Sequence, residues 1–275
     1  MTSRAESIIS DVMTSDAYRG AVATLAAEHD RTVEDIIALT QIEAPSFQEA
    51  TRAQAFRNMA EAHGLKDLEI DAERNVTGMR PGAGNGPIIC IAAHLDTVFP
   101  AGTDLTVRRE GTKLFAPGVG DDTRSLAVLL AWLRAMDAAG VRTRADLLFV
   151  ADVGEEGPGD LRGMRHLFQK GRYKDRISAF ITVDSPDMDR IAVGGVGSKR
   201  YRVTFKGPRR TQLRRVRPGE PDVRHGRCDR AARAHHGAQQ SEDHVQCERH
   251  WRRHVDQLDP QQRVDRLRPA LGRTG

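Results

Sequence analysis

Four short segments of the chain carry side chains that bind metal ions or move protons. They are His94–Val98 (HLDTV), Gly118–Asp122 (GVGDD), Val153–Pro158 (VGEEGP) and Val183–Ser185 (VDS). Imidazole nitrogen and carboxylate oxygen are ligands that zinc and similar divalent ions accept, and one carboxylate can bridge two ions. Each segment alone would more often be structural: a strand-end histidine, a helix cap or a solvated loop. Together, the four segments predict a metal centre.

The residue types within these segments indicate how the chemistry would be divided. Two adjacent glutamates, Glu155 and Glu156, can point different ways from a loop, so that one binds metal while the other acts as a general base. Asp96 follows His94 by two residues and is placed to accept the second imidazole N–H, which would set the tautomer of the ring. The Gly118–Asp121 stretch is not a phosphate loop, because no Lys and Ser/Thr follow at the required spacing.

The segments lie in an alternation of helical and strand-like stretches over residues 1–208, which predicts an α/β domain. Residues 3–41 have the pattern of helices. A further helix is expected from Ser46, as its cap, to about His63, since Gln and Glu follow in the first turn. Apolar residues at helical spacing over 122–139 predict a buried helix.

Three apolar runs predict strands that are buried on both faces, and a further strand-like region covers residues 68–79. The clearest run, residues 87–94, should be central in the sheet, and residues 145–152 and 179–184 are similar runs that end in acids. Ligands gather at the ends of strands in open α/β sheets. We therefore expect these strands to deliver the candidate residues to one edge.

The motifs HLDTV, GxxDD, GEEG and a strand-ending VD, in this order, resemble the dizinc metallopeptidase family. That family includes aminoacylase, glutamate carboxypeptidase, peptidase T, acetylornithine deacetylase and succinyl-diaminopimelate desuccinylase. The resemblance covers about residues 30–208, including the QIEAPSFQE segment at 41–49. It implies an α/β, zinc-peptidase-like three-layer catalytic domain with a central mixed sheet. This catalytic domain would be incomplete in the present chain. The implied function is metal-dependent hydrolysis of peptide or N-acyl amide bonds, of the exopeptidase or deacylase type.

The resemblance also implies a role for each candidate residue. Glu155 would be the base, which takes a proton from the attacking water and delivers it to the leaving nitrogen. Asp96 would be the acid that orients the imidazole. The metal ligands would be His94 and Asp184 on the first ion, Glu156 on the second, and Asp121 bridging both.

The cofactor would be two zinc ions, with cobalt and manganese as alternatives, and the substrate a small peptide or an N-acyl amino acid. Asp184, in place of Glu, favours a peptidase over the alternative, an N-acyl-amino-acid deacylase. The chain departs from many members at Thr123-Arg124, where they carry Lys-Gly. This departure weakens a subfamily assignment and leaves the ligands intact. His29, His63 and His166 match no motif and are expected to be structural.

The last 67 residues, 209–275, differ sharply in composition from the rest of the chain. They contain 16 Arg, no Lys and 9 acidic residues, a balance of +7, which leaves residues 1–208 at −3 of the net charge of +4. They also lack Ile, Phe, Tyr, Met and Asn, and show neither strand alternation nor a sustained helical stripe. We therefore expect a disordered tail without a core.

Arg-rich text often results when a G/C-rich gene is read out of frame. Codons exist for residues 209–217 that encode GGHSYGAF when read one base later, which is similar to the segment that opens the family's dimerisation or lid domain. We therefore expect that a frameshift truncates the family domain after Pro208. The lid, the surface of the family's homodimer and the last histidine ligand would be lost, so little or no activity is expected of this chain.

Composition bears on other classes of protein. No apolar run approaches the ~20 residues that span a bilayer, and no secretory apolar block is present, so we expect a cytoplasmic protein without a membrane partner.

Cys90, Cys228 and Cys247 fit neither a disulfide framework nor a CxxC zinc site. Nucleic-acid binding through the basic tail is the alternative of another class. Interspersed acids and a single aromatic residue, Trp251, argue against it.

Overall fold

The computed structural model describes residues 3–84, 86–184 and 190–194. The chain divides into two units, residues 1–191 and 192–275, and the helices and strands named here lie in the first. The helices are α1 (Arg4–Thr14), α2 (Asp16–Ala27), α3 (His29–Thr40), α4 (Ala50–Ala60), α5 (Arg124–Ala138) and α6 (Arg162–Gln169). The strands are β1 (Lys66–Ile70), β2 (Val76–Arg80), β3 (Ile88–His94), β4 (Arg108–Glu110), β5 (Lys113–Phe115), β6 (Asp146–Asp152) and β7 (Ile177–Thr182).

Five strands form a mixed sheet in the order β1-β2-β6-β3-β7, and β4 and β5 form a separate hairpin. β2 is antiparallel to both β1 and β6, whereas β3 is parallel to both β6 and β7. The register of β3 and β6 pairs His94 with Asp152. The carboxyl ends of β3 and β6 therefore meet at one edge, as the sequence predicts.

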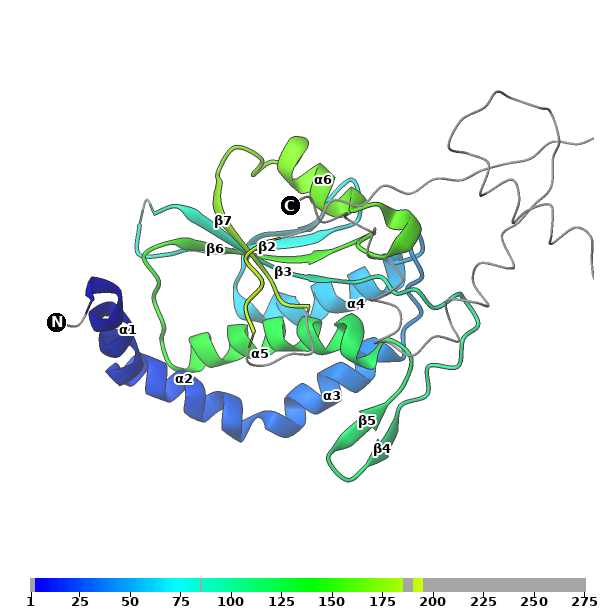
Figure 1. Cartoon of the computed structure of the whole chain (residues 1–275), viewed down its shortest axis with the longest axis horizontal. Helices are drawn as coiled ribbons and strands as arrows, with labels where there is room; N and C mark the ends of the chain where they lie inside the picture. Colours follow the sequence, from blue (N-terminus) through cyan, green and yellow to red (C-terminus); the bar gives the residue numbers. More distant parts are fainter. Residues whose placement is uncertain (1–2, 85, 185–189, 195–275) are drawn as a thin grey trace, which may run out of the picture. The chain divides into compact units, whose positions relative to one another are not determined.

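Helices cover both faces of this sheet. Figure 1 shows α4 and α5 against one face and α6 on the other, and α2 and α3 pack on α5. Side chains of β3 alternate between two cores, because successive residues of a strand point to opposite faces. Ile91 joins the α5 side and Cys90 the α6 side. This arrangement confirms the expected layered α/β fold and explains the unbroken apolar run that ends at His94.

The larger core gives a direct test of this packing. Leu129 of α5 is fully buried in it, and replacing Leu129 by Ala is expected to lower the free energy of unfolding by about 2–5 kcal/mol, since a cavity remains. Urea denaturation followed by circular dichroism measures the change. The matched control is Ile8→Ala on the exposed face of α1, expected within about 0.5 kcal/mol of the parent. Equal effects of the two changes would contradict the placement of α5.

The prediction that Ser46 caps a helix is wrong. α4 begins at Ala50, after Glu49, and no side chain caps it. Phe47 adopts a left-handed backbone conformation (φ 74°), which a helix does not permit, and the Ser46 hydroxyl donates to the Asp96 carboxylate at 2.9 Å. Ser46 therefore bonds to the Asp96 carboxylate, just after β3, and does not cap α4.

The prediction of three strands buried on both faces holds for β3 and β6 but is wrong for β7. Most residues of β7 are exposed, because it lies at the edge of the sheet that the described residues form. Other expectations are confirmed, since residues 3–41 form three helices and residues 68–79 cover most of the β1–β2 pair. Among the described residues, none of the helices has the length and apolar content needed to cross a bilayer.

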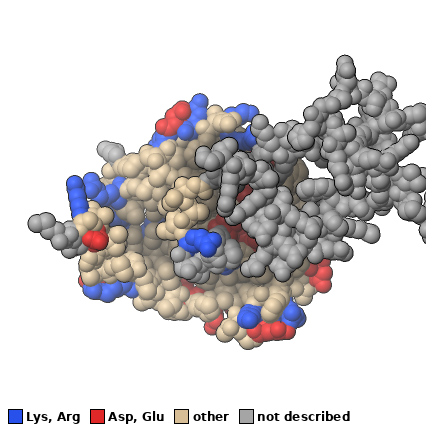
Figure 2. All heavy atoms as spheres, viewed as in Figure 1, with Lys and Arg blue, Asp and Glu red and all other residues tan. Residues whose placement is uncertain are grey.

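The basic excess predicted for the tail lies outside the described residues. On the face shown in Figure 2, basic and acidic side chains of the described part are interspersed among neutral ones, and they do not gather into one extended basic surface there.

Candidate metal centre

The five predicted metal-binding and base residues reach one place from four parts of the chain. His94 is the last residue of β3, and the loop after β6 carries Glu155 and Glu156. Asp121 lies in the segment η2 (Val119–Thr123) that leads into α5, at a kink where its own backbone is not helical (φ −137°, ψ 90°), and Asp184 lies two residues beyond β7. The strand ends and loops that the sequence indicated therefore converge.

Two groups of potential ligands share the imidazole of His94. In the first, the Nε2 atom of His94 lies 2.9 Å from Asp121 Oδ1 and 3.8 Å from Asp184 Oδ1. In the second, the ligand atoms of His94, Glu155 and Glu156 lie within 4.8 Å of one another, and the same limit holds for the first group. The chain thus brings a nitrogen and four carboxylates into a space that metal ions of ordinary coordination distances could occupy.

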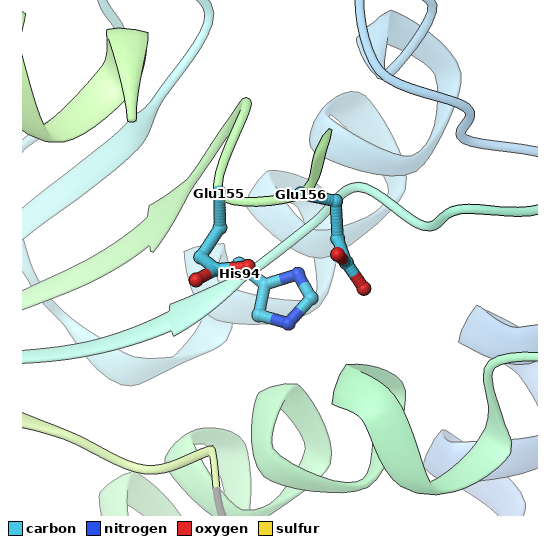
Figure 3. A group of neighbouring side chains, drawn as sticks. All are labelled: His94, Glu155 and Glu156. Atoms are coloured by element: carbon cyan, nitrogen blue, oxygen red, sulfur yellow. The ribbon is translucent and has the colours of Figure 1, made fainter. Parts of the chain in front are cut away.

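The imidazole at this site is buried, whereas two of the carboxylates around it are exposed. The His94 side chain is only 3% exposed, whereas the side chains of Asp121 and Asp184 are 64% and 42% exposed. Figure 3 shows the side chains of Glu155 and Glu156 on either side of the His94 ring, each descending from the loop after β6. The carboxylates therefore face both the ring and the solvent from which a metal ion or substrate would arrive.

Asp96 positions the site through its main chain and its side chain. His94 Nδ1 lies 3.0 Å from the main-chain carbonyl of Asp96 and 3.7 Å from its carboxylate. The predicted contact with the imidazole is therefore made at hydrogen-bond distance by the carbonyl. The fully buried carboxylate accepts the main-chain N–H groups of Glu155 at 3.0 Å and Glu156 at 3.1 Å, and the Ser46 hydroxyl at 2.9 Å. It holds the loop that presents both glutamates.

Replacing Asp96 by Asn is expected to weaken binding of a divalent ion by about 10- to 100-fold, as when residues that orient ligands are lost. The Asn amide replaces one carboxylate oxygen by a donor, which cannot accept from the loop. Calorimetric titration with Zn²⁺ or Mn²⁺ measures the dissociation constant. Asp175→Asn, at an exposed aspartate remote from the site, is the matched control and should leave the constant unchanged. An unchanged constant in Asp96→Asn would show that the loop needs no such anchor.

Two buried acids next to His94, Asp122 and Asp152, are not among the site residues that the sequence predicts. The Asp122 carboxylate accepts the main-chain N–H of His94 at 3.0 Å, and Asp152 is paired with His94 in the sheet register. Both are buried, and the peptide bond that joins Asp121 to Asp122 is cis. The signals were present in the sequence, since Asp152 ends an apolar strand and Asp122 adjoins a predicted ligand.

The electrostatics of the site are dominated by negative charge. Burial acts to lower the pKa of His94, but the hydrogen bond with Asp121 and the charges of Asp122, Asp152 and Asp96 raise it to about 10. The pKa of Glu156 is raised to about 7 by burial and by the neighbouring charges of Asp121 and Glu155. A cluster of carboxylates this crowded favours the binding of cations. A donor set of one imidazole and several carboxylates fits zinc, cobalt or manganese.

An ion pair joins the loop before α4 to the region after β6. The Arg162 guanidinium donates to both carboxylate oxygens of buried Glu49, at 2.8 and 2.7 Å, and lies 5.1 Å from the centre of the Phe47 ring. Glu49 also accepts the main-chain N–H of Phe47 at 2.9 Å. The contact joins residues 113 positions apart, and no local sequence signal indicated it.

The fold matches a solved peptidase structure, and the sequence matches curated hydrolases over part of their length. The di-peptidase Dug1p from Saccharomyces cerevisiae superposes with a TM-score of 0.52 at 16% identity, over 71% of this chain and 43% of that chain, a likeness of fold alone. Carboxypeptidase G2 from Pseudomonas sp. (strain RS-16) is 29% identical over 136 residues, 48% of this chain and 32% of the relative. Succinyl-diaminopimelate desuccinylase from Alkalilimnicola ehrlichii is 29% identical over 164 residues, 53% of this chain and 43% of the relative.

This chain therefore spans less than half the length of these curated relatives. The family comparison covers a longer stretch, because the model described as peptidase family M20/M25/M40 matches residues 90–266, past Pro208 and into the Arg-rich tail. That stretch includes the segments that carry His94, Asp121, the two glutamates and Asp184. With the layered sheet, the converging carboxylates and this match over more than half of its length, the chain belongs to peptidase family M20/M25/M40.

Proposed function

We propose that this protein is a metal-dependent hydrolase of peptide or N-acyl amide bonds, of the exopeptidase or deacylase type. The observation that carries the proposal is the pair of ligand groups that share His94 at the edge of the sheet. Membership of a peptidase family supports it. Two ions are proposed from the resemblance to the dizinc family, and in that assignment Glu155, a member of the second group, is the base and not a ligand.

The residues would divide between the two ions as follows. His94 and Asp184 would hold the first ion, Glu156 the second, and Asp121 would bridge them. When bound, divalent ions at such a site supply Lewis acidity, which acidifies water and polarises an amide carbonyl. Asp122 would hold the main chain at His94, whose N–H its carboxylate accepts at 3.0 Å.

Glu155 would be the general base. Its pKa is raised by burial and by the charges of Asp184, Asp96 and Asp121, which outweigh the opposite influence of His94. A carboxylate of raised pKa takes up a proton more readily and can later return it. In the proposed reaction, an oxygen of the Glu155 carboxylate accepts the proton of the attacking water and then delivers it to the leaving nitrogen. Asp96 positions this group by holding its main-chain N–H.

Two kinds of observation bear on the choice between peptidase and deacylase. Asp184 at the strand-end position favours a peptidase, and one curated relative is by name a carboxypeptidase. Another relative is by name a desuccinylase, which favours the deacylase alternative. We propose small peptides as the first substrates to examine and N-acyl amino acids as the second.

The experiment that tests the proposal combines metal titration with hydrolysis. The chain is expected to bind Zn²⁺, Co²⁺ or Mn²⁺ at two sites in calorimetric titration, and Asp121→Asn is expected to lose one site and weaken the other, because it removes the bridging carboxylate. Asp175→Asn is the matched control for the change of Asp to Asn. Any hydrolysis of dipeptide or N-acyl amino acid panels should disappear with a chelator and return with metal. Identical titrations of the parent and Asp121→Asn would refute the proposed centre.

A further inference from the structure

The loop after β6 that presents Glu155 and Glu156, residues 153–156 (the glutamate loop; Figure 3), packs against the side chain of Arg162, the first residue of α6. Gly154 of this loop has a left-handed backbone (φ 71°), and a Cβ atom placed on it would lie 2.7 Å from Arg162 Cγ and 3.0 Å from Arg162 Nε. A side chain at position 154 would therefore collide with the arginine. The loop thus contacts Arg162 directly, and the position of the arginine limits where the loop can lie.

The Arg162 guanidinium is held by acceptors that lie outside the glutamate loop. Its Nη2 donates to both carboxylate oxygens of Glu49, at 2.8 and 2.7 Å. Its Nη1 donates to the main-chain carbonyl of Glu73 at 2.7 Å and to the Glu73 carboxylate at 3.2 Å. Two parallel hydrogen bonds between a guanidinium and a carboxylate determine direction as well as distance. Because the Glu49 side chain is only 2% exposed, water does not compete for it, and the arginine is held in one orientation.

The segment that carries Glu49 also reaches the other side of the glutamate loop. Ser46, three residues earlier, donates its hydroxyl to the Asp96 carboxylate at 2.9 Å, and the same hydroxyl lies 3.3 Å from the main-chain carbonyl of Glu156. The Asp96 carboxylate in turn accepts the main-chain N–H groups of both glutamates. Contacts therefore reach the loop from two sides, from Asp96 and from Arg162, and the segment before α4 joins them.

We propose that Arg162 and Glu49 are positioning residues, whose ion pair holds the glutamate loop in the conformation in which Glu155 and Glu156 face His94. This role rests on the proposed function, in which Glu156 binds a metal ion and Glu155 is the base. Neither Arg162 nor Glu49 belongs to the ligand groups that share His94, so the pair acts on the ions only through the loop. Breaking the pair removes the support at Gly154 and leaves one buried charge without its partner.

A second buried ion pair provides the matched control, because it lies away from the glutamate loop. Arg134 Nη1 donates to Asp35 Oδ2 at 2.7 Å and joins α5 to α3, and the Asp35 side chain is only 6% exposed. Arg134 also donates to Glu28 at 2.8 Å, so it has two acidic partners, as Arg162 has. About 15 Å of helix separates Arg134 from the start of α5, where Asp121 lies. A pair that only stabilises the fold should behave as this one does.

Titration of the full chain with Co²⁺, followed by visible absorption, reports the affinity and the coordination geometry of the bound ion. Arg162→Met and Glu49→Gln are each expected to weaken Co²⁺ binding at least about tenfold, as when residues that orient ligands are lost, and to change the spectrum at saturation. Arg162→Lys keeps the charge but not the two parallel hydrogen bonds, and should have a smaller effect in the same direction. Arg134→Met and Asp35→Asn should keep the affinity and the spectrum of the parent.

Hydrogen exchange of the metal-free chain tests the hold on the loop directly. The main-chain N–H groups of Glu155 and Glu156 bond to Asp96, and they are expected to exchange at least about tenfold faster in Arg162→Met than in the parent or in Arg134→Met, because local opening becomes easier.

The proposal is overturned if Arg162→Met and Arg162→Lys keep the Co²⁺ affinity and spectrum of the parent, or if the two amides exchange equally fast in Arg162→Met and Arg134→Met. A parent chain that binds no Co²⁺ would refute the metal centre instead. The exchange rates would then still decide whether the ion pair holds the loop, since they are measured without metal.

Discussion

Reading the codons after residue 208 one base later is expected to raise the hydrolysis rate at least about a thousandfold over that of the chain as printed. If the expected frameshift is real, the re-read segment would restore the opening of the lid domain, and translation continued in that frame would supply the dimer surface and the last histidine ligand that the family resemblance implies. His94, Asp121, the two glutamates and Asp184 are common to both versions. Hydrolysis of a dipeptide panel, with metal content measured for each protein, determines the difference.

The nucleotide sequence around codon 208 is the first control for this prediction. Codons that cannot encode GGHSYGAF when read one base later would contradict the frameshift. Equal turnover of the two proteins would contradict it as well. The tail lies outside the described residues, and the family match continues to residue 266. Whether the tail is read out of frame is therefore decided by the nucleotide sequence and the hydrolysis rates.

In the re-read protein, Glu155→Gln is expected to lower hydrolysis by about 10²- to 10⁴-fold while the metal content stays that of the parent, since the change removes a base and no ligand. A Gln amide keeps the size of the side chain but does not accept the proton of the attacking water. Steady-state kinetics on the best dipeptide and elemental analysis of the dialysed protein give the two readouts.

Glu156→Gln is the matched control, because the two glutamates are adjacent and make the same type of main-chain contact with Asp96. We expect this control to lower metal content together with the rate. If Glu155→Gln lost metal as Glu156→Gln does, Glu155 would be a ligand and the assignment of the base would be wrong. If it kept both the metal and the rate, another residue would take the proton.

The sequence determined most of what is periodic or local in this protein. The apolar runs that end at His94 and Asp152 predicted buried strands, because a strand covered on both faces must be apolar at successive positions, and the structure pairs the two. The carboxyl ends of parallel strands meet at one edge of a sheet, so the candidate residues could be placed together before any distance was known. The donor types by themselves then indicated a metal.

The tertiary structure decided which partner satisfies each buried polar group. Ser46 has the residue type of a helix cap and a suitable following Glu, yet its hydroxyl bonds to Asp96, 50 positions away. β7 has the composition of a buried strand, yet the order of the sheet leaves it exposed. Local propensity is worth roughly 1 kcal/mol per residue and yields to such long-range pairing.

The sequence by itself therefore determined the kinds of donors and the strands and loops that carry them. Only the tertiary structure decided that the Asp96 carboxylate anchors the glutamate loop and that Arg162 pairs with Glu49. The physical reason is that hydrogen bonds and ion pairs act over about 3 to 4 Å and depend on direction. Contacts between residues far apart in the chain follow from how whole elements pack, which residue types and spacing do not specify.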